Sequence, residues 1–271
     1  IFKSTHIWVI APWCWNPNSI YNLYDKKIIS TIHHIDFDKF NKIEQEKFYK
    51  KDKFVTYYHA VSEKTKIDLE SITNKKIITL PFWVNNKIFF PIKDKSFLKK
   101  KYSIPNNSYV VGSFQRDSEG HDVTLPKLSK GPDRLIEIFI DLNKKKKNLI
   151  VILTGRRRDY LLSKLEENKI KYLYFNMTSF TELNEIYNIL DLYVVASRVE
   201  GGPQAIVECA SAKVPIISTN VGLASQILNK SSIFEFPNYE TAVPDIRYSY
   251  KNVEKLFLEN WCGQFNEKLI L

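Results

Sequence analysis

The chain has 271 residues, of which 44% are hydrophobic, 26% are charged and 14% are aromatic, and its formal net charge is +10. This composition is typical of a packed globular protein, so it excludes disordered, collagen-like and disulfide-scaffold classes, and the length is sufficient for one large domain or two modest ones. The sequence begins with Ile1 inside a strand-like pattern, so we expect a preceding stretch to be missing.

The first ninety residues alternate between apolar runs and helical patterns. Strands are predicted at 6–10, 28–32, 55–60 and 77–80. Helices are predicted at 37–53 and 62–72, with Asp38 and Ser62 as their N-caps. A stretch punctuated by prolines follows at 81–105, and its charged KDKSFLKKK run predicts a linker in which lysines 99–101 are solvated.

A second series of strands and helices follows the linker. Strands are predicted at 109–113, 149–153, 171–175, 192–196 and 215–218. Helices are predicted at 132–143, with Pro132 at the first helical position, and at 158–167, 180–190 and 203–212. Arg156, Arg157 and Arg158 are expected to face solvent at a helix start, and so are the lysines at 144–147.

Strands separated by helices predict right-handed βαβ units and parallel sheets. The expected fold is therefore α/β, with two doubly wound Rossmann-like domains facing a cleft, the first of them incomplete. We expect a first domain at 1–92, a linker at 93–108 and a second domain at 109–245. A C-terminal helical segment at 246–271 is expected to pack back on the first domain.

The segment at 192–219 carries the most informative chemistry. A buried strand ends at Ser197, and Glu200 follows in a short loop. Seven residues separate Glu200 from Glu208, which lies in the following helix. The carboxyl edge of a doubly wound sheet is where ligands bind. Gly201 and Gly202 allow close backbone approach, and free N–H groups at a helix start hold anionic or hydroxyl oxygens. Glu208 has apolar neighbours, so its carboxylate needs a partner, which a polyhydroxyl ligand would supply.

This segment resembles the signature of family 4 glycosyltransferases of the GT-B fold, S-x-x-E-G-x-P-x-x-x-x-E-A, with its E-x7-E pair. Its positions are occupied here by Ser197, Glu200, Gly201, Pro203 and Glu208. Cys209 stands where alanine is commoner. Asp191, the Val214-Pro215 pair, AVSEKTKIDL and PFWVNNKIFFP resemble other parts of the family pattern, so the similarity extends over most of the chain.

The resemblance implies a donor site for a nucleotide-diphosphate sugar. Glu200 would contact the donor sugar and Glu208 the ribose, while Arg116 and Lys130 would hold the diphosphate on either side of an inserted loop at 117–129. Two cations and a helix N-terminus can stabilise the leaving diphosphate without a metal. The other implied donor contacts are Gly201, Gly202, Pro203 and Gln204 after the strand, and Met177 near the base.

The HHIDFD stretch supplies a further candidate. The resemblance implies a histidine near the donor sugar and the acceptor, and His33 fits its spacing better than His34, so Glu200 and His33 are the candidate catalytic residues. Asp36 and Asp38 also form a D-x-D pattern that could be a metal cluster with the histidines. Asp38 is an ordinary helix N-cap, so no metal site is expected.

The implied activity is a metal-independent, retaining transferase of the hexosyltransferase type. It would move a sugar to a glycan, lipid or other hydroxyl acceptor by front-side displacement, with no cofactor besides the donor. The family's Gly-rich loop after the first strand is missing, so the alternative is a degenerate or non-catalytic domain that binds a nucleotide sugar.

The remaining composition bears on partners and compartment. If the +10 charge served nucleic-acid binding, the affinity would depend steeply on salt. The sequence contains no nucleic-acid-binding motif, so no nucleic-acid partner is expected. Cys14, Cys209 and Cys262 are far apart and lack CxxC spacing, which favours the cytoplasm over an oxidising compartment. No apolar run approaches the ~20 residues of a membrane helix, so any membrane contact is expected to be peripheral.

Overall fold

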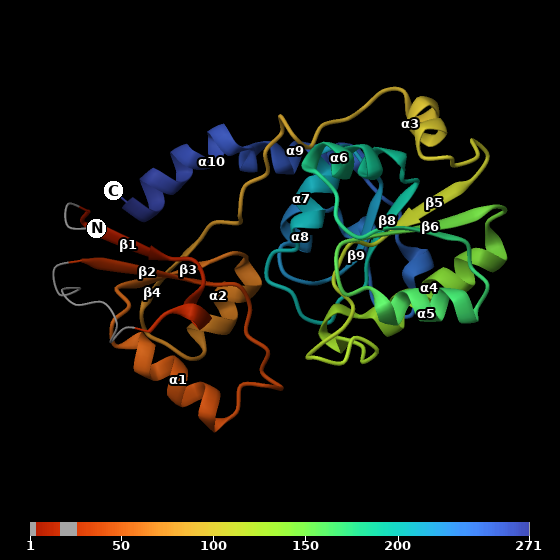
Figure 1. Cartoon of the computed structure of the whole chain (residues 1–271). Coiled ribbons are helices and arrows are strands. Elements are labelled where there is room, and N and C mark those ends of the chain that lie inside the picture. Colours follow the sequence, from red (N-terminus) through yellow and green to blue (C-terminus); the bar gives the residue numbers. More distant parts are fainter. Residues whose placement is uncertain (1–3, 17–25, 271) are drawn as a thin grey trace.

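Two parallel β-sheets organise the computed structural model, which describes residues 4–16 and 26–270 (Figure 1). In these residues the first sheet has four strands in the order β1-β2-β3-β4, and the second has six in the order β10-β9-β8-β5-β6-β7. The first contains β1 (His6–Val9), β2 (Lys27–Ile32), β3 (Tyr57–Ala60) and β4 (Lys76–Thr79). The second contains β5 (Tyr109–Gly112), β6 (Leu149–Thr154), β7 (Tyr172–Phe175), β8 (Leu192–Val195), β9 (Ile216–Thr219) and β10 (Ile233–Phe234). The predicted α/β fold with two parallel sheets is confirmed.

Helices connect the strands and cover the sheets. In the first series they are α1 (Lys42–Asp52) and α2 (Glu63–Glu70), and α3 (Lys95–Lys101) lies between the sheets in the chain. In the second series they are α4 (Pro132–Lys145), α5 (Asp159–Glu167), α6 (Phe180–Ile189), α7 (Gln204–Ser211) and α8 (Ala224–Ile227). The chain ends with α9 (Ile246–Val253) and α10 (Leu258–Phe265). Among the described helices none is long and apolar enough to cross a membrane.

The start of α1 differs from the prediction. Residues 37–39 form a turn, in which the carbonyl of Asp36 accepts from the Lys39 amide at 2.9 Å, so Asp38 lies outside the helix. Asn41 is the N-cap, and its Oδ1 accepts from the amides of Ile43 (3.0 Å) and Glu44 (3.2 Å). The predicted Asp38 cap is therefore wrong, because an equally good cap follows a turn that the helical pattern conceals.

The predicted linker contains a helix whose lysines are not all solvated. Asp94 caps α3 by accepting from the Phe97 amide at 2.8 Å. Lys99 is only 6% exposed, and its Nζ donates to the carbonyl of Ser108 at 2.8 Å and lies 3.7 Å from Asp191. Lys95 pairs with the same aspartate at 2.6 Å. The solvated interpretation of Lys99 is wrong, since Asp191 supplies the counter-charge before β8.

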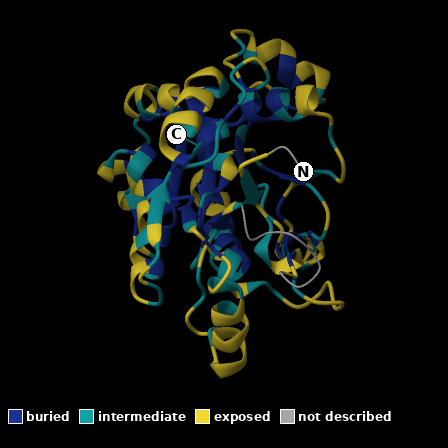
Figure 2. Ribbon diagram, turned by 90° about the vertical axis from the view of Figure 1, so that its left-hand side faces the viewer, coloured by how far each residue is buried: buried dark blue, intermediate teal, exposed yellow. Residues whose placement is uncertain are grey.

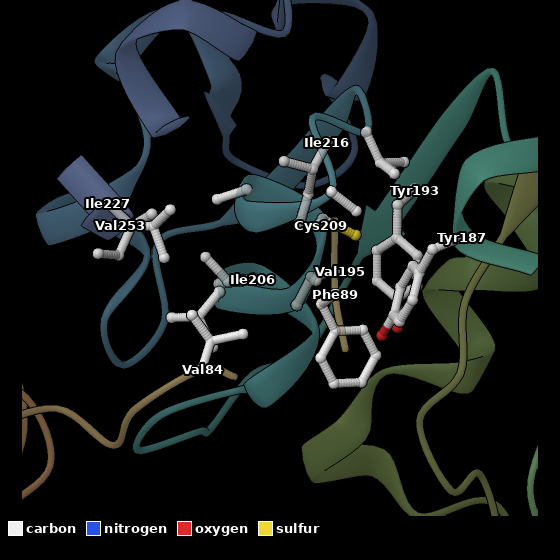
Figure 3. Close-up of a cluster of buried hydrophobic side chains, with 14 of the residues drawn as sticks. Val84, Phe89, Tyr187, Tyr193, Val195, Ile206, Cys209, Ile216, Ile227 and Val253 are labelled. Carbon is white, nitrogen blue, oxygen red and sulfur yellow. The ribbon is translucent and has the colours of Figure 1, made fainter. Parts of the chain in front are cut away.

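The core lies mainly around the second sheet, where most of the buried hydrophobic residues are found. Figure 2 shows buried residues in the interior of the molecule and exposed residues on its outer helices and loops. Both faces of the sheet are covered by helices, which explains the nearly continuous apolar strands β6 and β8. In Figure 3, Tyr187 of α6 and Tyr193 of β8 lie side by side near Phe89, and Cys209 of α7 is buried in the same cluster. This core fixes α6, α7 and β8 relative to one another.

The C-terminal segment contacts the first sheet. The ring of Trp261 in α10 stacks on Trp8 of β1 at 6.2 Å between centroids, and its Nε1 donates to the carbonyl of Pro81 at 2.6 Å. The hydroxyl of Tyr57 in β3 donates to the carbonyl of Leu269. Figure 1 shows α10 above the first sheet accordingly. We keep the names first domain (1–92) and second domain (109–245) for the division proposed above.

A buried histidine ties the first sheet together. His59 of β3 is fully buried, and its Nε2 donates to the carbonyl of Leu80 at 2.6 Å. Its Nδ1 must therefore accept, and the hydroxyl of Thr31 lies 2.9 Å away and itself accepts from Trp8 Nε1 at 2.8 Å. Each side-chain polar atom in this series of hydrogen bonds has a partner while the imidazole of His59 is neutral.

Acid is expected to destabilise the fold through this histidine. Burial lowers the pKa of His59 to about 4, so between pH 6.5 and 4 the folded chain binds fewer protons than the unfolded chain. The free energy of unfolding should therefore fall by about 2 kcal/mol from pH 7 to pH 5 on this account. Urea denaturation at both pH values measures it, and a His59→Gln variant should show a clearly smaller difference between the two; an equal difference would contradict the assignment.

Candidate active site

The candidate site forms where two neighbouring strands of the second sheet end. Because β5 and β8 are adjacent and parallel, their carboxyl ends bring the GSFQRD segment beside the Ser197–Glu200 segment. The amide of Gln115 donates to Glu200 Oε1 at 3.0 Å, and the hydroxyl of Ser197 donates to Gln115 Oε1 at 3.0 Å. Glu200 is only 9% exposed, so these contacts hold its carboxylate in a defined orientation.

Lys130 is the cation that faces Glu200. Its Nζ lies 2.5 Å from Glu200 Oε2, and its side chain is 23% exposed. It is placed by the short turn Leu128–Lys130 and by Gly131, whose φ of 65° is a left-handed conformation. A Cβ on Gly131 would lie 2.0 Å from the carbonyl oxygen of Ala196. The start of α4 can therefore approach the end of β8 closely only with glycine at this position.

The loop after Glu200 contacts the first domain. A Cβ on Gly201 would lie 1.4 Å from the carbonyl oxygen of His33, and Gly202 packs near Leu223. Pro203 is the N-cap residue of α7, and the side-chain Nε2 of Gln204 donates to the carbonyl of Trp83 at 3.1 Å. This candidate donor-binding turn therefore also joins the two domains.

Glu208 has a protein partner. The hydroxyl of Tyr187 in α6 donates to Glu208 Oε2 at 2.6 Å. Burial raises the pKa of Glu208, and the hydrogen bond from Tyr187 opposes that rise. The carboxylate for which the sequence predicts a polyhydroxyl partner is thus already oriented by a tyrosine.

Within the described residues, no hydrogen bond or ion pair joins Arg116 or Met177 to this cluster of contacts. Arg116 is exposed at the start of the loop between β5 and α4. Its charge lowers the pKa of Lys127 in the same loop, after the larger lowering that burial causes. Met177 is 69% exposed in the connection between β7 and α6. The structure thus brings together Glu200 and Lys130, with Gly201 beside them, and places Arg116 next to a lysine that the sequence did not single out.

The two histidines after β2 have different surroundings. His33 Nε2 donates to the carbonyl of Ile10 at 2.9 Å, and its ring lies 5.2 Å from that of Trp13 and 5.5 Å from that of Phe82. Burial lowers the pKa of His34, Lys130 lowers it further, and Glu200 raises it. Both members of the Lys130–Glu200 pair therefore act on the pKa of His34.

A pocket of the first domain opens beside His34. It encloses about 430 Å³ and combines aromatic walls from Trp13, Phe40 and Phe48 with polar side chains that include His34 and Asp36. Aromatic faces with a polar rim suit the two faces of a sugar ring. Through the described ranges, 4–16 and 26–270, no group of three or more His, Cys, Asp or Glu side chains is arranged to hold a metal ion, and this includes the D-x-D stretch.

The model of the family "Glycosyl transferases group 1" matches residues 125–256, the part of the chain that carries Lys130, Glu200 and Glu208. This stretch of the chain is similar to that family. The fold is GT-B, as similar solved structures show: sucrose-phosphate synthase from Thermosynechococcus elongatus has a TM-score of 0.75 at 14% identity, over 97% of this chain and 72% of that one. HepE from Anabaena in complex with UDP-glucose has a TM-score of 0.71 at 16% identity, over 89% of this chain and 71% of that one.

Curated protein sequences are also similar to this chain. A probable sucrose-phosphate synthase from Thermosipho melanesiensis is 26% identical over 200 residues, which cover 72% of this chain and 44% of that protein. The O-antigen biosynthesis glycosyltransferase WclY from Escherichia coli is 25% identical over 183 residues, 64% of this chain and 48% of that protein. The chain spans about half the length of the curated relatives that it matches.

The sequence pattern did not indicate every residue at the site. Gln115 fits no motif, and its role follows only from the adjacency of β5 and β8, which a single sequence does not reveal. Lys127 lies in the loop that the sequence marks as an insertion. The sequence could have indicated Lys127 through its spacing, because residues three positions apart lie on the same side of a short turn.

Proposed function

We propose that the chain binds a nucleotide-diphosphate sugar in the second domain and transfers the sugar, with retention of configuration, to a hydroxyl of a glycan or lipid-linked acceptor. The observation that carries the proposal is the Glu200–Lys130 pair at the carboxyl edge of β8, 2.5 Å between charged atoms. HepE, which resembles this chain in fold, is described in complex with UDP-glucose, so this nucleotide sugar is the first donor to test.

The proposed chemistry assigns a task to each side chain. Lys130 and Arg116 neutralise the diphosphate as the bond from the sugar C1 to the phosphate oxygen breaks and the electron pair leaves with the diphosphate. Glu200 accepts a hydrogen bond from a sugar hydroxyl, and Glu208, held by Tyr187, accepts one from the ribose. The acceptor oxygen then bonds C1 on the face that the diphosphate leaves, and its proton passes to the leaving phosphate.

The acceptor is proposed to enter from the first domain. The support for this is a pocket of the first domain that combines aromatic side chains with His34, whose pKa is affected by Lys130 and Glu200. Between the two candidate histidines, we therefore favour His34 as the side chain that touches the reacting groups. His33 supports the contact between the domains, because its ring is hydrogen-bonded to the carbonyl of Ile10 and its own carbonyl lies against Gly201.

Donor binding is expected to raise the thermal stability of the chain. A ligand at 100 times its Kd stabilises a protein by about 2.7 kcal/mol, which corresponds to a rise in Tm of about 5 °C or more for a chain of this size. A thermal-shift panel of UDP-, GDP- and ADP-sugars measures this and identifies the base. If none of these compounds, tested up to 10 mM, changed the Tm, the proposed function would be wrong.

A further inference from the structure

The loop between β5 and α4 is a hairpin. The Lys127 amide donates to the carbonyl of Asp117 at 2.7 Å, and the Glu119 amide donates to that of Leu125 at 3.3 Å. An antiparallel bridge joins Ser118 and Pro126 between these bonds. Lys127 therefore lies directly across from the residue that follows Arg116. After the hairpin, the Lys130 amide donates to the carbonyl of Lys127 at 2.8 Å. A single turn therefore joins Lys127 to Lys130, the other cation proposed to hold the diphosphate.

Buried contacts hold the base of this hairpin. Asp117 lies 3.4 Å from Arg158, and its Oδ2 accepts from the Leu161 amide of α5 at 3.3 Å. The Asp117 amide donates to the carbonyl of Arg157 at 3.2 Å. At the tip, Glu119 pairs with Lys39 of the first domain at 2.9 Å. The hairpin is therefore a fixed element rather than a free loop, and Lys127 has a fixed backbone position beside the candidate site.

Lys127 of this hairpin lies among other positively charged residues. Lys127 is half-buried, and the charged groups that act on it are Arg116, Lys130 and Lys39, with Glu119 as the opposing acid. The two nearby acids already have partners, since Glu119 pairs with Lys39 and Glu200 with Lys130. No carboxylate of the described residues lies within ion-pair distance of Lys127 or Arg116. A half-buried cation among cations is unfavourable without an anion.

We propose that Lys127 is a third cationic contact for the diphosphate of the donor, carried to the site by the Asp117–Lys127 hairpin. This inference rests on the proposed function and extends it beyond the Arg116 and Lys130 pair. A bound diphosphate supplies the charge that the cluster lacks, and the ammonium of Lys127 donates hydrogen bonds to its oxygens. The hairpin is in this way a part of the donor site and not a neutral insertion.

Binding of anions by the full chain tests the inference. Isothermal titration with inorganic pyrophosphate, and with UDP, GDP and ADP, compares wild type with Lys127→Ala. The Kd of pyrophosphate and of the bound nucleoside diphosphate should rise about tenfold, and Lys127→Arg should restore most of the affinity. The salt dependence of the affinity should also become shallower, because one cation is removed.

Controls separate this inference from the proposed function. Lys144→Ala removes an exposed lysine at the far end of α4 and should leave each Kd unchanged. Equal melting temperatures of wild type and Lys127→Ala exclude unfolding as the cause of weaker binding. If wild type binds a nucleoside diphosphate and Lys127→Ala binds it equally well, the role of Lys127 is refuted while the donor site stands. If wild type binds none of the four compounds, both are refuted.

Discussion

Replacing Glu200 with glutamine is expected to lower the rate of sugar transfer by about 10²–10³-fold, the cost of removing one well-placed electrostatic contact in an active site. The amide keeps the shape of the side chain and can still accept from Gln115, but it loses the charge that faces Lys130 at 2.5 Å. Because Lys130 is then free to contact the diphosphate, the KM for the donor should stay the same or fall. Release of sugar from the donor measures both parameters.

Lys130→Ala is the complementary change. It removes a diphosphate contact, so the KM for the donor should rise as the rate falls. The opposite effects of the two variants on KM distinguish the roles of Glu200 and Lys130. Glu259→Gln is a matched control, since this glutamate is 78% exposed and pairs only at the surface with Lys87. If Glu200→Gln turned over donor as wild type does, the assignment of Glu200 would be wrong. Donor binding without turnover in wild type would favour the non-catalytic alternative.

Asp117→Asn is expected to cost about 3–5 kcal/mol of stability, because it leaves the buried guanidinium of Arg158 without a counter-charge. The side chains of Arg158 and Asp117 are 0% and 2% exposed. Burial raises the pKa of Asp117, and the positive charge of Arg158 opposes that rise. The buried aspartate therefore depends on Arg158 to stay ionised. Urea denaturation at pH 8, where the aspartate is ionised, measures the loss.

A double variant provides the control for this ion pair. Asp117→Leu combined with Arg158→Met removes both charges and should be far less destabilised than Asp117→Asn, because no buried charge is left unpaired. The double variant should retain the fold even though its hairpin is less well anchored. A loss below 1 kcal/mol in Asp117→Asn would contradict the importance of the pair. An equally large loss in the double variant would point to packing instead of charge.

The pair also shows where prediction from the sequence stopped. Arg156, Arg157 and Arg158 form a run that predicts solvated side chains, and Arg156 is indeed exposed. Arg158, however, is buried, and its Nη2 donates to the carbonyl of Ser113 at 2.8 Å. The prediction for Arg158 was wrong because its partners, Asp117 and Ser113, are more than forty positions away. A local pattern contains no information about such a partner.

Local signals were sufficient where the physics is local. Ser62 caps α2, and Pro132 begins α4, as predicted, because caps and fixed φ angles depend on a few adjacent residues. The parallel sheets follow from the alternation of apolar and amphipathic segments. The spacing of Glu200 and Glu208 indicated the family, but the Gln115 contact and the closeness of Lys127 to the site depend on tertiary structure.

The most direct measurement of the central claim is ¹H NMR of the wild-type chain with the nucleotide sugar that raises its Tm most. We expect slow loss of the donor's anomeric signal and first appearance of free sugar in the same anomeric configuration, before mutarotation, because water can replace the acceptor. The same sample with Glu200→Gln should show almost no loss. Sugar released first in the opposite configuration, or an intact donor with wild type after overnight incubation with and without glycan acceptors, would contradict the account.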